Sequence, residues 1–186
     1  MTATTSEVSV PGYEAATWNI DAAHSEVGFS VRHMMVSKVR GRFTNFSGQI
    51  VTAENPLESS VTAEIDLTSI HTGQEQRDQH IQSADFFEVE KYPTMTYRST
   101  GVRVEDGEYI LDGDLTLKGV TKNVPLRLEL QGFAEDPYGG YRAGFTATGE
   151  LNRRDFNVNF NAPMQNGGVV VADKIQLHLE IEAVKA

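Results

Sequence analysis

The C-terminal third of the chain alternates between apolar and polar residues with a period of two. Ile175, Leu177, Leu179 and Ile181 are separated by polar residues, and the segment 140–154 follows the same rule. Successive side chains of a β-strand point to opposite sides of the sheet, so each such segment has one apolar and one polar face. The pattern predicts strands that turn one face toward a shared interior.

Segments of this kind fill most of the chain. Asp106-Gly107 predicts a tight two-residue hairpin because both positions tolerate positive φ. The links are short and no βαβ pattern occurs, which favours antiparallel neighbours. We therefore expect an all-β fold, an eight-stranded antiparallel barrel. The expected strands are 17–33, 39–53, 58–70, 93–105, 108–118, 120–134, 140–154 and 170–184.

One segment departs from the alternation. Residues 72–88 are rich in helix formers and carry apolar residues at three-residue spacing. This predicts one short helix over 74–84, between the third and fourth strands, followed by the apolar pair Phe86-Phe87. We expect residues 1–16 to form a flexible N-terminal tail and 17–186 a single barrel domain.

Composition excludes several functional classes. The formal net charge of -10 disfavours binding to nucleic acid, and the absence of cysteine excludes disulfides and thiolate chemistry. The N-terminal residues have neither the basic nor the apolar region of a secretory signal, so we expect a cytoplasmic protein. The predicted outward faces carry no apolar band for lipid, which argues against a membrane-spanning barrel.

The predicted interior mixes large side chains with small ones such as Ala63, Gly113 and Ala147. An eight-stranded barrel is just wide enough to be filled by its own side chains or to hold one small ligand. The space beside the small residues is therefore taken either by a ligand or by large neighbours. The side chains available to fill it are Phe29, Phe43, Phe46, Met95, Tyr97 and Phe145.

Two polar residues, His33 and Arg153, continue the inward parity at strand ends, near a barrel mouth. There they could hydrogen-bond the head of an apolar ligand, or be rim residues satisfied by Asp155 or by backbone. Neighbouring His24 and Ser25 face opposite sides of a strand and make a poor base–nucleophile pair. We predict no catalytic residues and no metal ligands; the alternative is an enzyme that acts on an apolar substrate with the residues at the mouth.

A basic cluster interrupts this acidic chain. Its members are Arg32, Lys38, Arg40 and Arg42. Such a cluster suits a phosphate head group or a transient contact with an anionic membrane. It also suits a solvated edge strand that protects itself from aggregation, and both interpretations stand.

Three segments resemble the YceI-like family of lipid-binding, lipocalin-like barrels. They are Trp18–His33 (WNIDAAHSEVGFSVRH), Arg77–Pro93 (RDQHIQSADFFEVEKYP) and Leu111–Val124 (LDGDLTLKGVTKNV), in the family's order and spacing. The resemblance implies a lipocalin-like barrel whose long apolar pore binds a polyisoprenoid or the tail of an isoprenoid quinone. It implies no cofactor besides this ligand, and no catalytic residue. The expected partner is an apolar, lipid-like small molecule; a monomer and a homodimer both fit the sequence.

The resemblance also implies roles for particular residues. Val27, Phe29 and Val31 would line the pore, with Phe86 and Phe87 near its end. The family's Arg-x-Asp-Phe stretch matches residues 153–156, and Asn157 stands where the family usually has glycine. With the inward-facing residues added, the predicted ligand-binding set is Val27, Phe29, Val31, His33, Phe43, Phe46, Phe86, Phe87, Met95, Tyr97, Leu115, Leu117, Phe145, Arg153, Phe156 and Leu177.

Overall fold

The computed structural model describes residues 10–162 and 170–186, which form one antiparallel sheet and a short α-helix. The strands are β1 (Ala16–Ile20), β2 (Glu26–His33), β3 (Ser37–Phe43), β4 (Phe46–Thr52), β5 (Ser60–Asp66), β6 (Ile70–His71), β7 (Thr94–Glu105), β8 (Glu108–Leu117), β9 (Val120–Asn123), β10 (Leu126–Glu135), β11 (Tyr141–Asn152) and β12 (Val171–Lys185). The helix is α1 (Glu75–Gln82).

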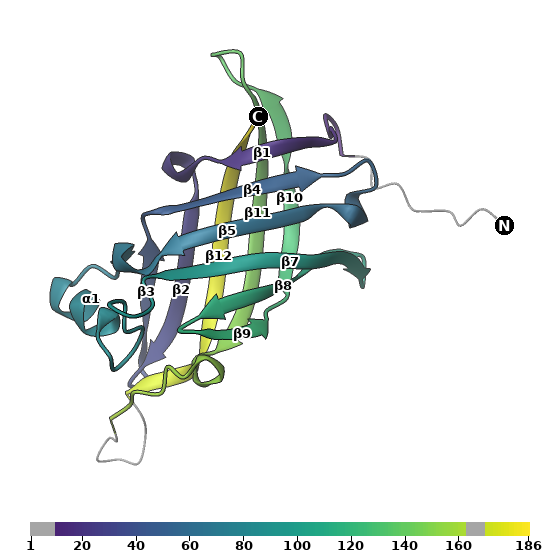
Figure 1. Cartoon of the computed structure of the whole chain (residues 1–186). Coiled ribbons are helices and arrows are strands. Elements are labelled where there is room, and N and C mark those ends of the chain that lie inside the picture. Colours follow the sequence, from purple (N-terminus) through teal and green to yellow (C-terminus); the bar gives the residue numbers. More distant parts are fainter. Residues whose placement is uncertain (1–9, 163–169) are drawn as a thin grey trace.

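The sheet closes into the expected eight-stranded barrel (Figure 1). The ring runs β1-β4-β5-β7-β8-β10-β11-β12, and the β12 end closes it by pairing with β1. β2 continues the course of β1 and pairs with the other half of β12. In the same way β3, which pairs with β2, lies in line with β4, and β6, which pairs with β3, lies in line with β5. The predicted strands 17–33, 39–53 and 58–70 are therefore each present as two pieces of one kinked strand.

Two of the interruptions have a local cause in the sequence. Between β1 and β2, a 3-10 turn at Ala22–His24 begins where the Asp21 carboxylate accepts a hydrogen bond from the Ala23 N–H at 3.0 Å. Between β9 and β10, Pro125 has no N–H to contribute to the ladder, and the predicted strand 120–134 divides there. The first kink shifts the inward alternation by one residue, from the even-numbered Trp18 and Ile20 of β1 to the odd-numbered Val27 and Phe29 of β2.

The predicted helix is confirmed with slightly shorter bounds. Asp78, in the first turn of α1, accepts a hydrogen bond at 2.9 Å from the N–H of Thr72, which precedes the helix, and this bond fixes the start of the helix against the preceding loop. The helix lies beside β6 at one end of the barrel (Figure 1). Within the described residues, no helix has the length and apolar character needed to cross a bilayer.

The hairpin predicted at Asp106-Gly107 joins β7 to β8. Both residues have positive φ, 51° and 78°, as a two-residue turn of this twist requires. Residues 1–9 of the predicted tail, and residues 163–169, lie outside the described residues. The rest of the predicted tail contacts the barrel, where the Tyr13 hydroxyl donates to the Ala53 carbonyl.

One end of the barrel is packed solid around Trp18, which has no exposed surface. The Trp18 Nε1 donates to the Thr52 hydroxyl at 2.8 Å, and that hydroxyl donates in turn to the Glu14 carbonyl at 2.6 Å. We call this group the Trp18 cluster; its members are Trp18, Ile50, Phe133, Tyr141, Ala143 and Ala183.

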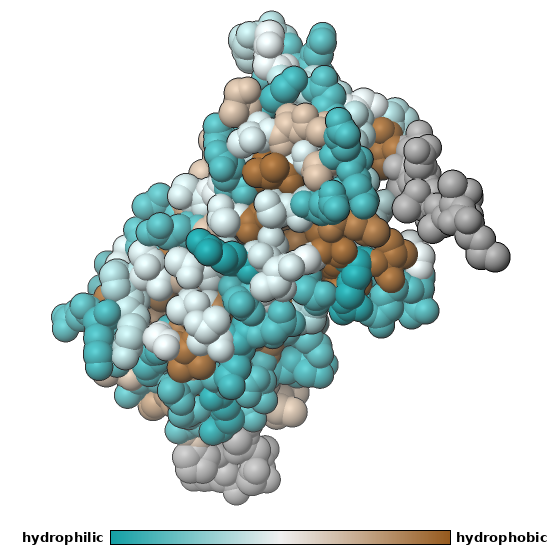
Figure 2. All heavy atoms as spheres, turned by 45° about the vertical axis from the view of Figure 1, so that its right-hand side comes forward, coloured by the Kyte–Doolittle hydropathy of each residue, from teal (hydrophilic) through white to brown (hydrophobic). Residues whose placement is uncertain are grey.

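The outer face is largely hydrophilic (Figure 2). On the face that Figure 2 shows, apolar side chains gather near the ends of β4 and β7, where Val51, Leu57 and Val104 are exposed. The alternation of the sequence is thus kept in space, with polar side chains outside and apolar side chains inside.

Candidate functional site: an apolar cavity along the barrel

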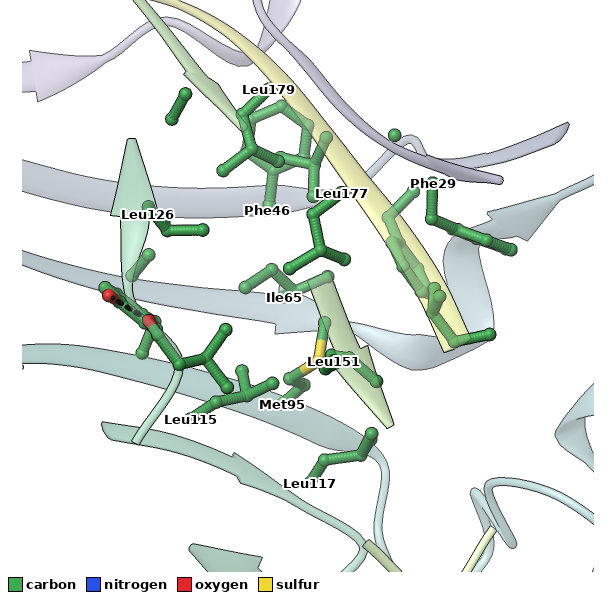
Figure 3. A pocket seen from close by; sticks show the side chains of 18 of the residues that line it. Phe29, Phe46, Ile65, Met95, Leu115, Leu117, Leu126, Leu151, Leu177 and Leu179 are labelled. Atoms are coloured by element: carbon green, nitrogen blue, oxygen red, sulfur yellow. Dashed lines mark hydrogen bonds between the residues drawn. The ribbon is translucent and has the colours of Figure 1, made fainter. Parts of the chain in front are cut away.

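An apolar cavity of about 460 Å³ occupies the interior beyond the Trp18 cluster. Each strand of the closed ring except β1 supplies several of its walls, and β1 supplies Ile20. Figure 3 shows how these side chains converge from different strands. The labelled ones are Phe29, Phe46, Ile65, Met95, Leu115, Leu117, Leu126, Leu151, Leu177 and Leu179.

The cavity extends along the barrel rather than across it. Tyr13 and Tyr109 line it toward one end, whereas His33, His80 and Phe160 line it toward the end that carries α1. On β12 the lining runs from Val171 to Ile181, a stretch of about 30 Å at 3.3 Å per residue. A long, narrow molecule fits this shape better than a compact one.

The space beside the small inward-facing residues is filled at some positions and open at others. Gly113 has no free space, because a Cβ atom there would lie 2.3 Å from the Tyr97 ring, and Gly149 is similarly covered by Leu126. Ala63 and Ala147, by contrast, face the cavity. Large neighbours therefore fill part of the interior and leave the remainder open.

The predicted ligand-binding residues lie around this cavity with one exception. All of them except Phe156 are part of its lining. Phe156 is 1% exposed and belongs to the surrounding core, because it lies on the 3-10 turn Arg153–Phe156, which packs against β9. Phe156 was expected from the resemblance to the family's Arg-x-Asp-Phe stretch, and the structure places its ring in the core beside the cavity rather than in the cavity wall.

Tyr97 contributes its ring and keeps its hydroxyl away from any ligand. The hydroxyl donates to the Val124 carbonyl at 2.9 Å, and burial raises the pKa of this phenol well above its ordinary value. The side chain therefore stays neutral and presents an apolar wall.

Arg153 lines the cavity, but its hydrogen-bond donors are used within the protein. The guanidinium, 3% exposed, donates to the carbonyls of Val158 and Phe160 at 2.8 Å and of Ala172 at 2.9 Å. Burial lowers its pKa. Of the alternatives left open by the sequence, the structure shows satisfaction by backbone; Arg153 ties the turn after β11 to the start of β12.

The end that carries α1 has polar lining residues that the sequence did not single out. Arg77 and His80 come from the helix, and His80 packs edge-on against Phe86 and Phe160 with ring centroids 5.1 and 4.9 Å away. Position 160 lies beyond β11, where no alternation marks an inward side chain. His33 lines the same end from β2.

The residues named for an enzymatic alternative do not act together. Asp155 is exposed and is not part of the lining, and Arg153 is held by backbone. Among the described residues, no hydrogen bond joins His33, Arg153 and Asp155. These three residues therefore do not form a base–nucleophile pair in this structure.

A second polar group lies near the packed end. Arg142 donates to Asp21 and Glu182, both at 2.9 Å, and to Asp136 at 2.8 Å. The Arg142 hydrogen bond, aided by His24, lowers the pKa of Asp21 to about 2. These ion pairs join β11 to the β1–β2 kink and to β12.

A closed antiparallel barrel of eight strands around an apolar cavity defines a lipocalin-like barrel protein. A model of the YceI-like domain matches residues 18–183. The chain belongs to the YceI-like family. The UPF0312 protein plu2095 of Photorhabdus laumondii is 44% identical to it over 146 residues, which cover 77% of this chain and 76% of the relative.

Two solved structures share the fold. The crystal structure of the Campylobacter jejuni YCEI protein superposes with a TM-score of 0.70 at 31% identity, covering 89% of this chain and 96% of that one. A polyisoprenoid binding domain from Saccharophagus degradans, implicated in plant cell wall breakdown, superposes with a TM-score of 0.66 at 17% identity. That likeness covers 93% of this chain and 100% of the domain, and shows the fold alone.

Proposed function

We propose that this barrel binds one long apolar molecule, a polyisoprenoid or an isoprenoid quinone, and stores or transports it. The observation that carries the proposal is the elongated cavity, whose walls are almost entirely aliphatic and aromatic. The family membership and the name of the Saccharophagus domain support the same class of ligand.

The hydrophobic effect is sufficient for such binding. Each CH₂ group transferred from water is worth about 0.8 kcal/mol, so several isoprene units could bind tightly with no polar contact. Selectivity would then come from the length and girth of the chain. His33 and His80, at the end that carries α1, are positioned to contact a polar head.

The test is to identify what the purified protein contains. Extraction with organic solvent followed by mass spectrometry should release polyisoprenoid or quinone in a fixed ratio to protein. The matched control is Ala147→Phe, which places a ring in the cavity from a position that lines it. Absence of such lipid from wild-type protein made in a quinone-rich host, or equal amounts from the folded variant, would contradict the proposal.

A further inference from the structure

The hairpin between β2 and β3 turns through an unfavourable pair of residues. Met34 and Met35 both have positive φ, 52° and 60°, and the Val36 N–H bonds the His33 carbonyl at 3.2 Å. Turns of this geometry favour Asn-Gly or Asp-Gly, because side chains with a Cβ are strained there. The same chain uses Asp106-Gly107 between β7 and β8. Folding alone does not explain two methionines at this tip.

The tip also exposes apolar surface to water. Met34, Met35 and Val36 are 41%, 55% and 83% exposed, although most apolar residues of the chain face the interior. Consecutive exposed apolar residues at one protruding point are typical of an interaction site rather than of a free surface.

Four cations lie directly behind the tip, on the outer face of the hairpin. Arg32 is paired across the strands with Lys38, and Arg40 and Arg42 follow on the same face. All are exposed, and none forms an ion pair with a carboxylate in the part of the chain that the structure describes. Like charges opposite each other weaken a strand pair. An acidic chain that leaves these cations uncompensated presents them to an anionic partner.

We propose that the β2–β3 tip docks the protein on an anionic lipid bilayer. Three apolar side chains fit among lipid tails and head groups, and the four cations behind them lie at the level of the lipid phosphates. An acidic protein surface would suit the cations and leave the apolar tip without a partner. The whole chain has a net charge of -10, so the acidic surface away from these cations is repelled by the same bilayer and the tip also fixes the orientation.

The tip is next to the cavity. His33, at its base, lines the cavity, as do Val31 and Val39, which form the cross-strand pair two steps further in. Docking therefore brings the end of the cavity that carries α1 against the bilayer, where an apolar chain could pass between lipid and protein without crossing water. The docking proposal is argued from the residues of the tip alone, whereas the transfer of an apolar chain between bilayer and cavity also depends on the proposed function.

Flotation with lipid vesicles tests the docking. Wild-type protein should float with vesicles of phosphatidylcholine mixed with phosphatidylglycerol, and much less with phosphatidylcholine alone. The decisive variant is Met34→Asn with Met35→Gly, which installs the residues that this turn prefers. It should fold with an unchanged or higher melting temperature and lose most of the vesicle binding.

Charge variants complete the test. Lys38→Ala with Arg40→Ala should weaken binding to the anionic vesicles at least about tenfold, since each cation near such a surface is worth about fivefold. Arg98→Ala with Lys122→Ala removes two exposed cations from β7 and β9 and should leave binding unchanged. The proposal is overturned if vesicle binding survives the Met34→Asn, Met35→Gly change or falls equally with both pairs of charge substitutions. It is also overturned if the wild-type protein floats with neither kind of vesicle.

Lipid extraction of the same samples separates the two proposals. If the wild-type protein contains lipid but does not float with vesicles, the proposed lipid binding is supported and the proposed docking is contradicted. If the protein floats through the tip but contains no lipid, the docking is supported and the proposed lipid binding is contradicted.

Discussion

The two ends of this barrel use the same strands for different purposes. Around Trp18, side chains from β1, β4, β11 and β12 fill the interior, and Ala143 and Ala183 are 1% and 0% exposed. Further along β11 and β12, Ala147 and Leu177 face an open cavity. Ala143 and Ala147 are identical residues four positions apart on one strand and one face, yet one is in the packed core and the other lines the cavity.

The difference shows where stability and function are separated. Close packing is the rule for protein interiors, and an apolar void forgoes the contacts that would fill it. The Trp18 cluster, with its buried indole and its hydrogen bond to Thr52, compensates by closing the ring where β1 meets β12. The cavity can then remain open because the barrel does not depend on it for closure.

Loss of side-chain volume should therefore be most costly at the packed end. We expect Trp18→Ala to lower the free energy of unfolding by about 3–5 kcal/mol, since it leaves a cavity and removes the indole hydrogen bond to Thr52. Leu177→Ala, which only enlarges an existing void, should cost about 1–2 kcal/mol. Urea denaturation of lipid-free protein measures both; equal losses would show that the two ends do not differ.

Larger side chains should also be tolerated better in the cavity than at the packed end. Ala143→Phe inserts a ring into filled space and should lower the free energy of unfolding by about 3 kcal/mol, the upper part of the range for overpacking. Ala147→Phe inserts the same ring into the cavity and should cost less than about 1 kcal/mol. Denaturation curves of the two variants provide the comparison. A larger loss at position 147 would mean that the cavity is not open in solution.

Bound lipid should stabilise the cavity end specifically. At a free ligand concentration of one hundred times its Kd, binding adds about 2.7 kcal/mol to the free energy of unfolding. The thermal unfolding midpoints of delipidated and reloaded wild-type protein measure this gain. Ala147→Phe should show no gain, and an equal gain in that variant would place the lipid outside the cavity.

Much of this contrast could be predicted from the sequence. The period of two placed Phe29, Leu115 and Leu177 on inward faces, and all three line the cavity. Strand number, antiparallel pairing and the helix followed from local patterns and turn chemistry. Whether the interior was filled could not be predicted, because the outcome depends on which large side chain crosses to which small one, as Tyr97 does to Gly113.

Residues outside regular strands were the least predictable. β11 ends at Asn152, so the alternation gave no information on Phe160, while Phe156 was expected only from the family's Arg-x-Asp-Phe stretch and packs beside the cavity. Asn157 adopts the left-handed conformation, with φ of 58°, that glycine would also allow, so the turn survives the replacement. Met34 and Met35 carry no turn signal at all, and only the backbone revealed their conformation.

The polar group beside the Trp18 cluster should add the smallest effect, and one that depends on pH. Arg142 lowers the pKa of Asp21 from its ordinary 3.8 to about 2, so the ionised carboxylate favours the folded state. This contribution is complete above about pH 4 and is lost as the pH falls toward 2. Asp21→Asn should therefore destabilise the protein by under about 1 kcal/mol at pH 7.

Denaturation of wild-type and variant at a series of pH values checks this sign, because the difference between them should vanish between pH 4 and 2. Glu129→Gln, an exposed carboxylate on β10, is the control and should follow the wild-type curve. The amide oxygen introduced by Asp21→Asn can still accept from the Ala23 N–H, so the variant removes the charge and keeps the cap of the turn. A deficit of Asp21→Asn that persists unchanged at the acid end would therefore show that the charge of Asp21 is not its contribution, and the Arg142 ion pairs would be incidental to closure of the packed end.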